Sequence, residues 1–135
     1  MTEKEHAEMV ANLSRPLDCP DALDKIEHAL VGIVSEAGEM LGAFKKFRFY
    51  KNIGEITYET KLVDEGGDVL FYLTDLARLL GLDLEAFRDV NHAKLSTRYP
   101  EGFNKTDCTV RDKEKEQDVI NLALGAAYER VLNEV

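Results

Sequence analysis

Two pairs of acidic residues stand at separate places in the chain, and the members of each pair are three positions apart. Glu36 and Glu39 form the first pair, and Glu65 and Asp68 form the second. On a helix, residues three apart lie about one turn apart on the same side, so the two carboxylates of each pair repel each other. A bound cation relieves such repulsion. The spacing therefore predicts a site for a divalent cation.

The ligand type favours a hard metal ion. Mg²⁺ prefers oxygen ligands in octahedral geometry and usually keeps positions open for water and for substrate phosphates, and Mn²⁺ shares the preference for oxygen. Four carboxylates from two helices suit these ions, so we expect Mg²⁺, with Mn²⁺ as the second choice. The alternative interpretation is a solvated helix with a chance acidic spacing, which is common in a chain with 26 acidic residues.

Basic side chains stand where a phosphate chain would need them. One group follows the first acidic pair and consists of Lys45, Lys46, Arg48 and Lys51, and a second consists of Lys94 and Arg98, four positions apart. Lysine supplies a point charge to phosphate oxygens, and arginine supplies a two-pronged donor. The alternative is a solvated basic surface that pairs with nearby acids.

Glycines inside the predicted helices break a local rule. Each costs roughly 1 kcal/mol relative to alanine in a helix interior. Small residues beside the acids would let another helix or a ligand approach closely. These glycines are Gly38, Gly42, Gly66 and Gly67.

The elements that must position these groups are helices, because apolar residues recur at three-and-four spacing and strand patterns are nearly absent. We expect a short helix at 3–13, ended by the sequence before Pro16, and a long helix that Asp21 caps and that ends near Phe49. A loop at 50–54 leads to a helix that Thr57 caps and Gly81 ends. Further helices are expected at 83–98, where Asp83 is the cap, and at 112–134. The apolar stripe of the last helix would close the core or pair with a second subunit.

Size and charge exclude several classes of protein. The 135 residues fit one domain, and the formal charge of −9 disfavours nucleic acid and anionic membranes as partners. The longest apolar run, at 69–73, is far too short to cross a bilayer, and the first residues lack the pattern of a secretory signal. We therefore expect one all-α domain over 1–135, in the cytoplasm and without a membrane partner.

Three blocks in order resemble the MazG-like family of all-α nucleoside triphosphate pyrophosphohydrolases. They are Ser35-Glu36-Ala37-Gly38-Glu39-Met40, the stretch 64–73 that contains Glu65-Gly66-Gly67-Asp68, and the stretch 91–103 from Asn91 to Phe103. The resemblance covers about 21–104. It implies an enzyme that hydrolyses a nucleoside or deoxynucleoside triphosphate to the monophosphate and pyrophosphate, with a role in clearing unwanted nucleotides.

The resemblance also implies residue roles. Glu36, Glu39, Glu65 and Asp68 would hold Mg²⁺, while Lys46, Tyr72, Asn91, Lys94 and Arg98 would bind the substrate. Many members carry two adjacent glutamates before the spacer, and Ser35 stands at the first of these positions here. The catalytic base would then be Glu36, or a metal-polarised water with another partner.

The family acts as dimers or tetramers, so the resemblance implies helical hairpins that form a four-helix core completed by a second subunit. Two other functions stay open at this point. One is phosphoribosyl-ATP pyrophosphohydrolase, which shares the acidic helices. The other is a non-catalytic helical dimerisation module that binds nucleotides without cutting them.

Overall fold

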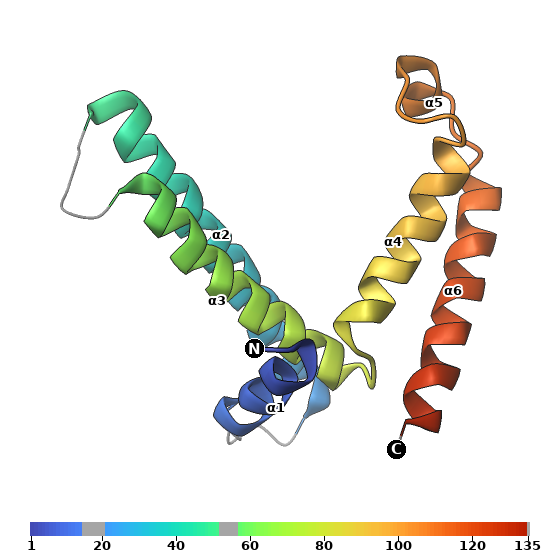
Figure 1. The fold of residues 1–135 in the computed structure, drawn as a ribbon, viewed down its shortest axis with the longest axis horizontal. Helices are drawn as coiled ribbons and strands as arrows, with labels where there is room; N and C mark the ends of the chain where they lie inside the picture. Colours follow the sequence, from blue (N-terminus) through green and yellow to red (C-terminus); the bar gives the residue numbers. More distant parts are fainter. Residues whose placement is uncertain (15–20, 52–56, 135) are drawn as a thin grey trace. The chain divides into compact units, whose positions relative to one another are not determined.

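The computed structural model describes residues 1–14, 21–51 and 57–134, and within these ranges it is all-α, without a strand (Figure 1). The helices among these residues are α1 (Glu3–Leu13), α2 (Ala22–Tyr50), α3 (Tyr58–Leu79), α4 (Leu84–Arg98), α5 (Lys105–Thr109) and α6 (Lys113–Asn133). The all-α prediction is confirmed. Pro16 and most of the expected 50–54 loop lie outside the described residues.

The caps that the sequence predicts form as expected. The side chains of Asp21, Thr57 and Asp83 each accept a hydrogen bond from a backbone N–H in the first turn of the following helix. These bonds satisfy donors that have no partner inside a helix. Gly81 follows the end of α3 with φ of 71°, a left-handed conformation that glycine adopts without strain.

The short helix α5 was not predicted. Asn104 caps it by accepting a hydrogen bond from the backbone N–H of Asp107. Five residues give too little apolar periodicity to be recognised in a sequence.

The chain divides into two compact units, Met1–Leu80 and Gly81–Val135. In the first unit, α2 and α3 pack along each other as a hairpin and α1 packs on α3. Val10 of α1 is fully buried, and the Thr74 hydroxyl of α3 lies 3.3 Å from Nδ1 of His6. That the whole chain forms one domain stays a prediction.

The second unit is an antiparallel pair of helices, α4 and α6, with α5 between them in sequence. The predicted apolar stripe of α6 faces α4, with Ala127 buried and Ile120, Leu124 and Val131 half-buried. Arg130 of α6 also pairs with Asp83 and Asp89 at the start of α4. The stripe therefore closes a core within the chain.

The hairpin of the first unit leaves much of its apolar surface exposed. Several positions that the helical pattern assigns to a core have large exposed fractions, namely Leu23, Leu30, Val34, Leu41 and Phe44 on α2. Two helices alone bury only a narrow stripe of each. No helix in the described part of the chain combines the length and the apolar character needed to cross a bilayer.

Candidate functional site

Three of the four predicted metal ligands meet between α2 and α3. Glu36 projects from α2, and Glu65 and Asp68 project from α3, with one carboxylate oxygen of each lying within 4.8 Å of the others. Glu65 is only 8% exposed, Glu36 is half-buried and Asp68 is exposed. The i, i+3 spacing on α3 turns both of its acids toward Glu36.

The electrostatics of this acidic cluster, defined here as Glu36, Glu65 and Asp68, are unfavourable. Burial raises the pKa of Glu36 above its ordinary value of 4.5, and the negative charges of Glu39, Asp68 and Glu65 raise it further. Glu39 is exposed and lies outside the cluster, but its charge acts on Glu36. A cation held by the three carboxylates would reverse this penalty.

A lysine partly offsets the charge. Lys61 lies one turn before Glu65 on α3, and its Nζ is 3.6 Å from Oε1 of Glu65 and 3.0 Å from Oδ2 of Asp64. The hydrogen bond to Asp64 and the nearby carboxylates raise the pKa of Lys61. One lysine against three clustered carboxylates leaves a net negative site of oxygen ligands, which fits a hard divalent cation.

One turn from the cluster, a ring packs against a helix backbone. Gly32 precedes Glu36 by four residues, Tyr72 follows Asp68 by four, and the Tyr72 ring lies against Gly32. A Cβ at position 32 would stand about 2.5 Å from ring atoms of Tyr72, a distance that real contacts do not show. Only glycine therefore allows this placement of Tyr72.

The glycines that the sequence analysis singled out beside the acids are not in close contact with another helix. A Cβ at Gly38, Gly42 or Gly67 would meet no atom within 4 Å, and one at Gly66 would meet only the Met40 methyl at 3.8 Å. No helix of the described chain uses these positions for close approach. Sequence reasoning missed Gly32, because only the register between α2 and α3 reveals its role.

The predicted substrate-binding residues are spread over both units. Tyr72 lies beside the acidic cluster, and Lys46 is exposed near the end of α2. Asn91, Lys94 and Arg98 lie on α4 in the second unit, which is described by itself. Lys94 is half-buried and has no ion-pair partner among the described residues.

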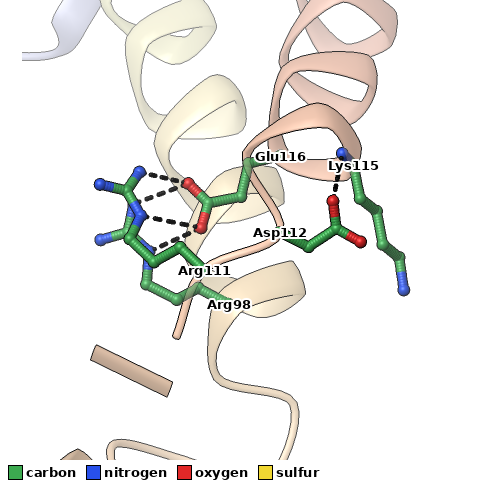
Figure 2. Close-up of polar contacts among 5 residues, drawn as sticks. All are labelled: Arg98, Arg111, Asp112, Lys115 and Glu116. Carbon is green, nitrogen blue, oxygen red and sulfur yellow. Dashed lines mark hydrogen bonds and ion pairs between the residues drawn. The ribbon is translucent and has the colours of Figure 1, made fainter. Parts of the chain in front are cut away.

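Arg98 is held by a carboxylate of α6. Its Nε and an amino nitrogen donate to the two oxygens of Glu116 at 2.9 and 2.8 Å, and Arg111 donates to the same two oxygens (Figure 2). Glu116 is 4% exposed. Hydrogen bonds from Arg98 and Arg111 hold its pKa well below the usual range. This triad joins the end of α4 to the first turn of α6.

The α2–α3 hairpin brings carboxylates from both of its helices together. The protein therefore falls in the class of helical proteins with a candidate cation site between antiparallel helices. The comparisons give the family. Residues 24–103 match the model of the MazG nucleotide pyrophosphohydrolase domain, and the chain belongs to this family. The match confirms the resemblance seen in the sequence and contains every predicted site residue.

A phage protein is similar to part of this chain. The chain is 36% identical over 87 residues to the Gene 37 protein of Mycobacterium phage L5, which covers 63% of this chain and 75% of the phage protein. The name of that protein states no activity. No solved structure shows significant similarity.

Proposed function

We propose that this protein is a Mg²⁺-dependent nucleoside triphosphate pyrophosphohydrolase, which converts an NTP or dNTP and water to the monophosphate and pyrophosphate. The observation that carries the proposal is the convergence of Glu36, Glu65 and Asp68 inside the segment that matches the family. Clearing surplus or non-standard nucleotides is the purpose we infer for this reaction.

The acidic cluster would hold the metal, and Glu39 would add negative charge at its edge. A divalent cation in such a site lowers the pKa of a bound water and neutralises phosphate charge. Glu36 is our candidate for the base that takes the proton of the attacking water, because its carboxylate lies in the acidic cluster where the metal-bound water would be held.

The phosphates need cationic partners as charge moves onto their oxygens. Lys94 is the first candidate, because no described residue occupies its ammonium group. Arg98 would have to exchange a hydrogen bond with Glu116 for one with a phosphate oxygen. Lys46, Tyr72 and Asn91 complete the proposed substrate-binding set.

A second copy of the chain is the proposed cover for the exposed apolar surface of α2. Leu30, Val34 and Leu41 are 48%, 72% and 68% exposed and lie on one side of the helix. Val31, Leu30 and Val34 also line a shallow hollow of about 450 Å³. A homodimer or homotetramer would bury this surface, as small helical domains often do.

The decisive experiment measures monophosphate and pyrophosphate release from a panel of ribo- and deoxynucleoside triphosphates with Mg²⁺. Glu65→Gln should abolish release, because the amide is a poor metal ligand, and it should leave the fold intact or more heat-stable. Glu129→Gln, at an exposed glutamate of α6, is the matched control and should keep full activity.

Thermal unfolding gives an independent readout of the metal site. Mg²⁺ should raise the melting temperature of the unmodified protein and of Glu129→Gln, but not that of Glu65→Gln. Full activity in Glu65→Gln would contradict the site. Binding of Mg²⁺ without release from any triphosphate would instead favour the phosphoribosyl-ATP enzyme or the non-catalytic module.

A further inference from the structure

The first unit contains a cavity beside the acidic cluster. It has a volume of about 530 Å³ and is bounded by the end of α1, the first turns of α2 and the second half of α3. Its lining includes Ser14, Lys25, His28, Tyr72, Asp75 and Arg78. The volume lies in the range of small-molecule sites, and the mixture of aromatic walls with a few polar groups is typical of them.

The cavity lies one to two helical turns from the acidic cluster. Asp75 follows Asp68 by seven residues and His28 precedes Glu36 by eight. At 1.5 Å per residue these separations are about 10–12 Å along the helices. A sugar and a base span a comparable length, so a nucleotide with its phosphates at the cluster would place its base in the cavity.

Flat aromatic side chains form one wall. The Tyr72 ring, fixed against Gly32, meets the His28 ring edge to face at a centroid distance of 5.8 Å. The Phe71 ring meets Tyr72 at 5.4 Å in the same manner. Such rings offer faces and edges on which a planar heterocycle packs.

The polar wall contains the carboxylate of Asp75. Asp75 is 6% exposed, and all of its donors converge on Oδ1, with Ser14 Oγ at 2.8 Å and Arg78 Nε and an amino nitrogen at 3.1 and 2.7 Å. No described residue donates to Oδ2. A carboxylate oxygen can accept more than one hydrogen bond, so Oδ2 is able to accept one from an N–H group of a ligand in the cavity.

We infer that this cavity binds the base of the substrate and that Asp75 Oδ2 selects bases with an exocyclic amino group. The carboxylate accepts a hydrogen bond from an amino group but repels the carbonyl oxygen that replaces it in the oxo bases. Lys25, on the opposite helix, supplies a donor for a ring carbonyl. The inference rests on the proposed function and adds a substrate class to it.

The inference is tested by comparing two nucleotides whose bases differ at the exocyclic amino group. The kcat/KM for dCTP should exceed that for dUTP at least tenfold, and ATP should exceed inosine triphosphate by a similar factor. Asp75→Asn should reverse the preference, because its amide nitrogen donates to a carbonyl. Asp118→Asn, at an exposed aspartate of α6, is the matched control and should keep the original preference.

Binding separates this inference from the proposed function. In Glu65→Gln, cytidine and uridine without phosphates are titrated while the amide spectra of the protein are followed. Cytidine should shift residues of the cavity more strongly than uridine, and Asp75→Asn should remove the difference. If this binding result is obtained but the unmodified protein hydrolyses no triphosphate, the proposed function is overturned and the base site stands.

Hydrolysis that is indifferent to the amino group, with Asp75→Asn unchanged, would overturn the base site and leave the function standing. If Asp75→Asn fails to fold, Lys25→Met gives the second test, since Lys25 pairs with no described residue. Lys25→Met should raise KM for dCTP at least fivefold with little change in kcat. An unchanged KM would also overturn the base site.

Discussion

At the scale of single residues, the ionisation of Glu36 determines how unfavourable the acidic cluster is for the metal-free protein. Burial raises its pKa first, and three neighbouring carboxylates add to the effect. A carboxyl whose pKa is higher in the folded than in the unfolded state binds its proton more tightly when folded. The charged form of Glu36 therefore destabilises the fold at neutral pH.

Replacing Glu36 by glutamine should raise the melting temperature of the metal-free protein by a few degrees at pH 7. The gain should shrink as the pH falls through the raised pKa, and vanish below 4.5, where Glu36 is protonated in both the folded and the unfolded states. Thermal unfolding from pH 4 to 8 in a chelator checks this. A gain that is the same at every pH would mean that packing, not charge, is responsible.

The residues of the acidic cluster could be predicted because helix periodicity alone places Glu65 and Asp68 on one side of α3. The Gly32–Tyr72 contact and the hydrogen bond from Ser14 to Asp75 could not be predicted. Both depend on which residues of two different helices lie opposite each other. One sequence does not contain that register.

At the scale of helices, local sequence signals were sufficient to predict where three of the helices begin. Asp21, Thr57 and Asp83 cap their helices through hydrogen bonds among near neighbours, so their effect is readable from a few residues. The pairing of Arg98 with Glu116 is different, since 18 positions separate the two residues. Its existence follows only from the packing of α6 on α4.

We expect Glu116→Gln to lower the melting temperature of the second unit by several degrees at pH 7. Both arginines lose their carboxylate partner inside a mostly buried contact. Because the pKa of Glu116 is lowered in the folded state, its contribution is present above pH 4.5 and is lost as the pH falls below that value.

The difference between variant and unmodified protein should therefore narrow in acid. Circular dichroism melts at pH 7 and pH 3 measure it. Glu114→Gln, at an exposed glutamate in the first turn of α6, controls for the loss of a charge near that helix start. An equal loss in both variants would assign the effect to the helix dipole.

At the scale of the whole molecule, the exposed stripe of α2 predicts assembly. Val34→Asp should convert an oligomer into a monomer, because a charge in an apolar interface loses its hydration. Leu132→Asp, at a similarly exposed apolar residue of α6, should leave the assembly unchanged. Sedimentation equilibrium distinguishes the species, and a monomeric unmodified protein would contradict the proposed interface.

The sequence predicted the all-α class and every described helix except the short α5, but the assembly depends on surfaces rather than on helices. The pattern on α2 marks Leu30 and Val34 as apolar without telling whether this chain or another covers them. The structure shows that α3 does not cover these two residues.

The contact between Gly32 and Tyr72 also has a mechanical meaning. Two antiparallel helices with smooth apolar faces can slide past each other, and a shift of one turn, ~5.4 Å, would carry Glu65 and Asp68 away from Glu36. The Tyr72 ring packs into the space that Gly32 leaves by having no side chain, and this steric contact resists such a shift. The contact between Gly32 and Tyr72, one turn from the acidic cluster, therefore helps to keep the three carboxylates aligned in the metal-free protein.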